Sequence, residues 1–175
     1  WYSDASSTIE PDLDQVSIVN TTFDDNVLKG FYTERLSNAT FDGITVDNSG
    51  SSSYAWGAGI DINLKWKGYS NIEVKNSTLS NCGIGSANGV GITIKARNDG
   101  TSYGANPATL SGVTIDNVEF DSNRTGLAFG EPTKDNDGPT SLVIKNSTFK
   151  SNTVMDINNF CKSDIDAKLN NTFTG

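Results

Sequence analysis

The sequence predicts an all-β fold, namely a right-handed parallel β-helix (a solenoid) of about five rungs with long loop insertions in the middle rungs. The main observation is a repeated phrase in which alternating apolar residues precede an Asn, and a Phe or Leu follows three residues after it. Full copies cover 16–23, 72–79, 113–120 and 142–149. In addition, no segment keeps the apolar period of a helix, so helices should be few and short. An antiparallel sandwich also gives short strands, but it does not predict the same phrase at corresponding points.

Each copy of the phrase begins with a short strand. In 113–120, the side chains of Val113 and Ile115 fall on one face and that of Thr114 on the other. The Asn that follows ends the strand, because Asn tolerates left-handed backbone geometry and its amide both donates and accepts hydrogen bonds. Stacked in successive rungs, these amides should form an asparagine ladder. The corner residues are Asn20, Asn38, Asn76, Asn117, Asn146 and Asn170.

Further columns follow at fixed distances from each corner. An apolar residue three positions later should form a second inward column, which consists of Phe23, Phe41, Leu79, Phe120, Phe149 and Phe173. The residues six positions after the corner suggest a second turn, and they are Asn26, Ile44, Cys82, Asn123 and Asn152. A second strand then starts at a glycine or another small residue. We place these second strands at 30–32, 59–62, 91–94, 126–129 and 154–157.

The length of 175 residues and the apolar fraction of 35% support one domain. Within it we expect a lead-in segment at 1–15, the rungs at 16–165 and a terminal partial rung at 166–175. Neither end has an obvious leader or cap, so we expect a segment or processed form of a larger protein. The large insertions have loop chemistry and lie at 49–53, 98–102 and 132–139.

Composition excludes several classes of partner and site. A net charge of −8 argues against a nucleic-acid surface, and no apolar run approaches the roughly 20 residues that span a bilayer. The chain has no histidine, which removes Ser-His-Asp and Cys-His catalysis and histidine zinc sites. Cys82 should be a small buried thiol. Cys161 lies two rungs later, so a disulfide between them is disfavoured.

Six Asn-x-Ser/Thr patterns resemble glycosylation acceptors. All but one coincide with a corner Asn, where the repeat itself requires Asn, so we assign those to structure. Asn123 is the exception and the one glycosylation candidate, because Arg124 beside it suggests an exposed turn. An extracellular or cell-surface location is expected from the fold class instead.

The runs at 113–123 and 144–152 resemble the repeats of pectate-lyase-like right-handed β-helix proteins, and 146–152 is also similar to repeats of adhesin-like surface proteins. The group includes polysaccharide lyases, epimerases, glycosidases and adhesins, so the resemblance alone does not select a function. Lyases of this group use a cationic base beside a calcium-bridged uronate. The resemblance therefore implies Arg97, with Lys95 near it, as the base, and Asp61 and Glu131 as metal ligands.

The same residues have a simpler interpretation as a solvated face, in which Asp99 and Glu131 balance the cations. Calcium is the only cofactor for which we find candidate ligands, and Asp135 and Asp137 extend them with a fragment of a calcium loop. A plain turn at this segment is the alternative.

A carbohydrate-binding function would use the insertions of the two middle rungs, at 49–53 and 98–102, differently. Their exposed rings would stack on sugar faces, and the basic residues would suit acidic sugars. The predicted carbohydrate-binding residues are Tyr54, Trp56, Lys65, Trp66, Tyr69, Arg97 and Tyr103. Alternatively, the rings anchor their own loops to the sheet.

We therefore predict a non-catalytic carbohydrate-binding or surface-structural module of adhesin type, with a polysaccharide or cell-surface glycan as partner. Two alternatives stay open. One is a lyase or glycosidase that acts on acidic polysaccharide, and the other is a subunit that associates end to end through open strand edges.

Overall fold

The computed structural model describes residues 1–3, 11–167 and 169–175. In this part of the chain the fold is all-β, as predicted, and every pair of neighbouring strands is parallel. The one helix found there, α1 (Gly100–Ala105), has six residues. No helix in the described ranges is long and apolar enough to cross a membrane.

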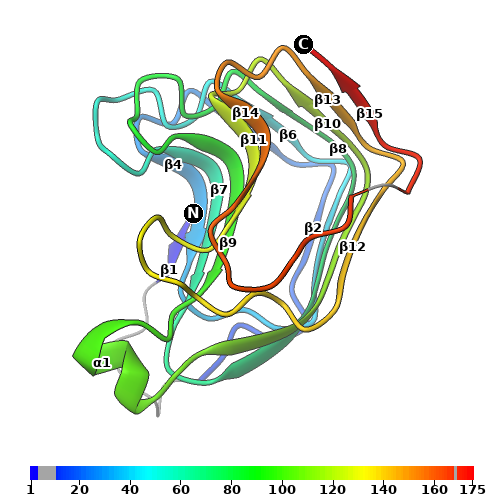
Figure 1. Cartoon of the computed structure of the whole chain (residues 1–175). Helices are drawn as coiled ribbons and strands as arrows, with labels where there is room; N and C mark the ends of the chain where they lie inside the picture. The colour runs from blue at the N-terminus through cyan, green and yellow to red at the C-terminus, as the bar shows by residue number, and fades with distance from the viewer. Residues whose placement is uncertain (4–10, 168) are drawn as a thin grey trace.

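The strands form two sheets, which Figure 1 shows facing each other. The six-stranded sheet contains, in spatial order, β1 (Tyr2–Ser3), β4 (Lys29–Thr33), β7 (Ala58–Leu64), β9 (Val90–Ala96), β11 (Thr125–Phe129) and β14 (Met155–Asn159). The main path of the nine-stranded sheet contains β15 (Thr172–Thr174), β13 (Thr148–Lys150), β10 (Thr109–Asp121), β8 (Gly68–Ser80), β5 (Ala39–Asp42) and β2 (Ser17–Val19). Its other strands are β3 (Thr22–Asp24), β6 (Thr45–Asp47) and β12 (Leu142–Lys145).

The chain alternates between the sheets. One or two strands of the nine-stranded sheet are followed by one strand of the six-stranded sheet, and this order repeats from β2 to β15. Such a path is compatible with a solenoid. Strand β1 lies in the expected lead-in segment, and the part of that segment at 4–10 is outside the described residues.

The first four second strands pair in the predicted register, since Phe31 is opposite Ile60, Ile60 is opposite Ile92, and Ile92 is opposite Leu127. The last strand is shifted by two residues from its predicted start, because Leu127 pairs with Ile157 rather than with Met155. Apolar side chains from both sheets fill the space between them and form one core cluster. The glycines that open these strands are needed for close approach, because a Cβ on Gly91 would lie 2.6 Å from the carbonyl oxygen of Gly126.

The corner asparagines have the predicted backbone geometry. All six have a positive φ, between 48° and 55°. Asn117 lies between Asn76 and Asn146 in the paired strands, and its Nδ2 donates to Asn76 Oδ1 at 3.0 Å. The next step changes partner, since Asn146 Nδ2 donates to Asp116 Oδ1 at 2.8 Å. The column of asparagines exists, but its side-chain amides bond in turn to another Asn and to an Asp carboxylate. The column lies at the exposed edge of the sheet.

One part of the predicted alignment is wrong. Asn38 does not share the column of Asn76. It lies at a different bend, where its Oδ1 accepts from Asn71 Nδ2 at 2.8 Å. Phe41 consequently pairs with Val74 rather than Leu79. Val46 takes the place that we assigned to Phe41, since it pairs with Leu79. The error arose because the chain bends three times here, at Asn38, Gly43 and Asn48, and the sequence offers Asn at two of these bends.

The second turn is a buried column. Cys82 N donates to Asn123 Oδ1 at 2.9 Å, and Asn123 N donates to Asn152 Oδ1 at 3.1 Å. Ser49, rather than Ile44, occupies the earlier position, where it accepts from Asn26 Nδ2. Both cysteines are free thiols. Burial raises the pKa of the Cys82 thiol to about 12.

Candidate functional site

The polar residues of interest lie on the outer face of the six-stranded sheet. Successive side chains of a strand alternate between faces, so Ile60 and Ile62 point to the core while Asp61 and Asn63 point outward. Register places Asp61 beside Thr93, and Asn63 beside Lys95, which confirms the gapless alignment expected for these strands. Every residue of β7 and β9 is nevertheless buried, because loops cover this outer face.

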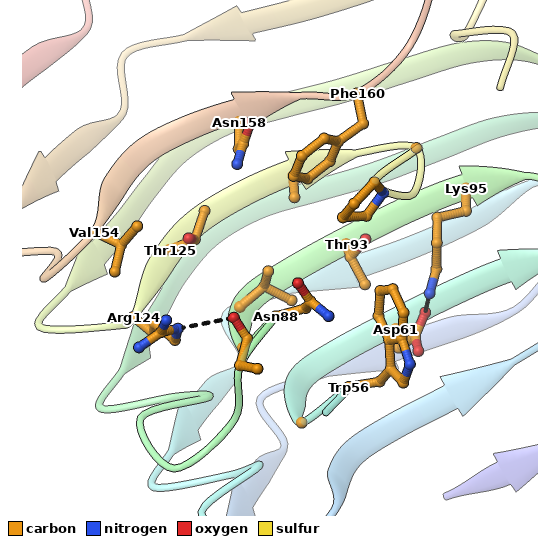
Figure 2. Close-up of a pocket in the computed structure, with 17 residues that line it drawn as sticks. Trp56, Asp61, Asn88, Thr93, Lys95, Arg124, Thr125, Val154, Asn158 and Phe160 are labelled. Carbon is orange, nitrogen blue, oxygen red and sulfur yellow. Dashed lines mark hydrogen bonds and ion pairs between the residues drawn. The ribbon is translucent and has the colours of Figure 1, made fainter. Parts of the chain in front are cut away.

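Two adjoining pockets lie on the outer face. The first extends from Trp56 across Thr93 to Arg124 and Phe160 (Figure 2). The second continues over Tyr32, Asn63 and Glu131. Both include Trp56, Asp61 and Lys95 in their walls, so they form one groove across the strands.

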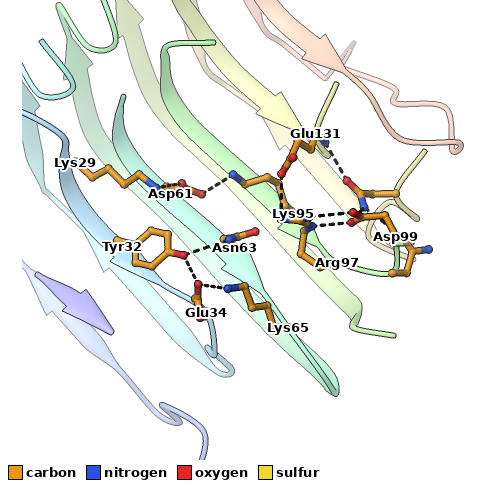
Figure 3. A network of polar contacts seen from close by, with 12 residues as sticks. Lys29, Tyr32, Glu34, Asp61, Asn63, Lys65, Lys95, Arg97, Asp99 and Glu131 are labelled. Atoms are coloured by element: carbon orange, nitrogen blue, oxygen red, sulfur yellow. Dashed lines mark hydrogen bonds and ion pairs between the residues drawn. The ribbon is translucent and has the colours of Figure 1, made fainter. Parts of the chain in front are cut away.

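Asp61 lies at the centre of this groove and is 1% exposed. Lys29 Nζ lies 2.5 Å from its Oδ2 and Lys95 Nζ lies 3.1 Å from its Oδ1 (Figure 3). The three residues come from β4, β7 and β9, three adjacent strands. A buried carboxylate is stable only when such partners compensate its desolvation.

A second group surrounds Tyr32. Its hydroxyl donates to Glu34 Oε1, and Lys65 Nζ pairs with the same carboxylate (Figure 3). Asn63 Nδ2 donates to Tyr32 Oη at 3.2 Å. Burial raises the pKa of Tyr32, and the hydrogen bond to Glu34 raises it further, so the hydroxyl stays protonated.

A third group is centred on Arg97. Its Nε and Nη2 donate to the two carboxylate oxygens of Asp99 at 2.7 and 2.9 Å, and Nη1 lies 3.1 Å from Glu131 Oε2. Burial alone would lower the pKa of the guanidinium, but the hydrogen bonds to Asp99 and the charge of Glu131 outweigh it and raise the pKa. The hydrogen bond from Arg97 lowers the pKa of Asp99 to about 2, against the opposing effect of burial.

Asn136 attaches the loop after β11 to this group. It is fully buried, its Oδ1 accepts from Glu131 N at 3.0 Å, and its Nδ2 donates to Asp99 Oδ1 at 3.0 Å. Asp135 and Asp137 flank it and are exposed. The segment is therefore a docked turn whose amide points inward and whose carboxylates point to solvent.

The predicted metal ligands do not come together. Asp61 is paired with lysines, Glu131 with Arg97, and Asp137 with Lys162 at 3.5 Å. No group of three or more His, Cys, Asp or Glu side chains in the described ranges is arranged to hold a metal ion.

The predicted aromatic set divides in two. Tyr54 and Trp56 line the groove, where Lys95 Nζ lies 5.4 Å from the Trp56 ring centroid. Trp66 and Tyr103 pack against each other with centroids 5.0 Å apart, and Tyr69 is buried with its hydroxyl donating to Lys65 O at 2.6 Å. The second set anchors loops, as the alternative interpretation of these rings proposed.

Of the predicted basic residues, Arg97 lines the groove beside Glu131. Lys65 interacts with Glu34 and lies 5.7 Å above the Tyr103 ring centroid. Both side chains are therefore held by neighbouring groups rather than directed freely to solvent.

Four residues of the site were not predicted, namely Lys29, Tyr32, Glu34 and Asn136. Tyr32 and Glu34 had a detectable signal, because extending the gapless strand alignment back to β4 places Tyr32 on Asp61. Asn136 had none, since its role depends on how a loop folds back onto a distant strand.

Asn123 is not exposed, contrary to our expectation. Its side chain is fully buried, and its Nδ2 donates to Leu79 O at 2.9 Å. A glycan cannot be attached there without breaking the second-turn column. The corner residues Asn76 and Asn146, which we had assigned to structure rather than to glycosylation, are exposed.

Comparisons with known proteins give no matching family model, curated protein or solved structure.

Proposed function

We propose that the two sheets are the walls of a right-handed β-helix with about five rungs, related to the pectate-lyase-like proteins, and that the chain is a non-catalytic extracellular module. In this proposal it binds a polysaccharide or cell-surface glycan on the outer face of the six-stranded sheet. The observation that carries the proposal is the groove in which Trp56 and Tyr54 stand beside convergent polar groups. Ligand sites of proteins typically combine such apolar surface with a few placed hydrogen-bonding groups.

Affinity electrophoresis through gels that contain soluble polysaccharides tests this function. We expect at least one polysaccharide to retard the protein, and Trp56→Ala to abolish the retardation. Lys75→Ala on the nine-stranded sheet is the matched control and should migrate as the parent does. If no polysaccharide in a broad panel slows migration, the binding function is wrong.

The enzymatic alternative has less support from the geometry. A catalytic base must give up its proton near neutral pH, and Arg97 is held between two carboxylates that raise its pKa. Lys95 is similarly paired with Asp61. We expect no unsaturated uronate to be released from pectate or alginate, with or without calcium, in an absorbance assay.

End-to-end association is a second candidate, favoured by apolar groups at both ends of the sheets. Phe173 on the edge strand β15 is 49% exposed and stacks on Phe149 with centroids 5.1 Å apart. At the other end, Trp1, Val16 and Ile18 line an apolar pocket. Light scattering at rising concentration tests this candidate, and a constant monomer mass would contradict it.

A further inference from the structure

The part of the groove around Asp61 has a charge balance that restricts its ligand. Four cations, Lys29, Lys65, Lys95 and Arg97, lie on the outer face, and each is paired with a carboxylate. The carboxylates are Glu34, Asp61, Asp99 and Glu131. Four positive and four negative groups leave this part of the face formally neutral. An acidic sugar would have to displace a carboxylate that is already part of a desolvated ion pair, which is unfavourable.

The groove instead offers hydrogen-bond acceptors. Asn63 is 8% exposed, and in the described part of the chain its Oδ1 has no hydrogen-bond partner. Tyr32 uses its own proton for Glu34 and therefore accepts from Asn63 Nδ2. The amide orientation is thus fixed, with Oδ1 directed away from Tyr32. A buried acceptor without a donor costs free energy, which a ligand hydroxyl can recover.

Asp61 provides a second acceptor two residues away on the same face. Lys95 Nζ lies 3.1 Å from Asp61 Oδ1 at ion-pair distance, but its direction does not give a hydrogen bond, and no other donor among the described residues reaches this oxygen. Two acceptors beside the half-buried Trp56 ring match a molecule that has both an apolar face and several hydroxyl donors.

We infer that this groove binds an uncharged glycan, with a sugar ring against Trp56 and its hydroxyls donating to Asn63 and Asp61. The inference rests on the proposed carbohydrate-binding function and replaces the acidic sugars that the sequence suggested. Arg124 in the adjoining pocket has no carboxylate partner among the described residues, and its Nε donates to Ala87 O at 3.2 Å. It lies outside the proposed subsite, at the other end of the groove (Figure 2).

The first experiment compares affinities for neutral polysaccharides (glucan, mannan, xylan and galactan) with those for acidic ones (polygalacturonate, alginate and hyaluronate). We expect binding to at least one neutral polymer at an affinity at least tenfold above any acidic one. Trp56→Ala and Asn63→Leu should each weaken it at least tenfold, whereas Lys75→Ala on the nine-stranded sheet should leave it unchanged. Unfolding curves of each variant establish that the fold is intact.

The second experiment reverses the charge balance. Asp61→Asn keeps the shape but removes the carboxylate that Lys29 and Lys95 share, so affinity for polygalacturonate should rise at least tenfold at low salt. If this variant does not fold, Glu131→Gln, which frees one side of Arg97, should give a smaller rise in the same direction.

The outcomes separate the two claims. Preferred binding of an acidic polysaccharide by the parent chain would overturn the present inference and leave the proposed function standing. Binding that Trp56→Ala and Asn63→Leu do not weaken would overturn the assigned subsite. No binding to any polymer would overturn both.

Discussion

The outer faces of the two sheets differ although their backbones are paired in the same way. In the nine-stranded sheet, buried and accessible residues alternate along β8 and β10, as expected for a sheet with one solvated face. In the six-stranded sheet, β7 and β9 are buried throughout. The ion pairs follow this difference, since the side chains of Lys145 and Asp116 are 41% and 28% exposed, whereas that of Asp61 is 1% exposed. Loop insertions, rather than the strands, therefore decide where polar groups become desolvated.

The largest contrast should come from removing one carboxylate from each face. Asp61→Ala leaves Lys29 and Lys95 buried without their shared partner, and should lower the free energy of unfolding by about 3–5 kcal/mol. Asp116→Ala removes the partner of Lys145 on the exposed face, and should cost less than about 1 kcal/mol. Urea unfolding followed by circular dichroism measures both, and equal losses would contradict the contrast.

A smaller contrast concerns glycine. A Cβ at Gly91 would lie 2.6 Å from Gly126 O, so Gly91→Ala must displace a strand of the six-stranded sheet and should cost about 1–3 kcal/mol. In α1, the nearest atom to a Cβ on Gly104 is 3.7 Å away. Gly104→Ala should therefore be neutral or stabilising by up to about 1 kcal/mol. Thermal unfolding of the two variants compares strand and loop directly, and similar melting temperatures would rule out the close approach at Gly91.

Acid should weaken the enclosed face through Asp99. Its pKa is lowered from 3.8 to about 2 in the folded chain, so its contribution to stability is present above the unfolded value and is lost as the pH falls toward 2. We expect Asp99→Asn to flatten the dependence of unfolding free energy on pH between 5 and 2. A parent-like pH dependence in this variant would show that Asp99 is not held by Arg97.

The smallest expected effect is at the exposed corner. Asn117 has a φ of 55°, a geometry that costs about 1–2 kcal/mol for a residue with a Cβ and no local hydrogen bond. Asn117→Ala should lower the free energy of unfolding by about 1 kcal/mol, and Asn117→Gly should lose less because glycine adopts this φ freely. If alanine and glycine have the same effect, the backbone geometry is not the cause.

The repeat allowed much of the fold to be predicted. The alternation of apolar and polar residues and the corner Asn predicted the strand positions and the parallel register of β7 with β9. They also predicted the bends at which Asn adopts a left-handed backbone conformation. The prediction was wrong at Asn38 because that segment has several bends with similar chemistry, and the local sequence does not say which of them stacks on the bend of the next strand. Asn123 was misjudged because the neighbouring Arg124 suggested exposure, whereas burial depends on the column to which a residue belongs.

The candidate site was predictable only in part. Trp56, Asp61 and Lys95 were identified because they lie in or beside strands whose register the repeat determines. Which cation pairs with which carboxylate could not be inferred, since those contacts depend on loop paths. The distinction between Trp56 in the groove and Trp66 against Tyr103 has the same origin.

The buried position of Cys82 has a practical consequence for measuring motion. With a pKa of about 12, almost none of this thiol is ionised at neutral pH, and alkylating reagents react with the thiolate. Its labelling should therefore be slow until the second turn separates from the strands. Labelling rates at this position report the opening frequency of the chain interior without any introduced probe.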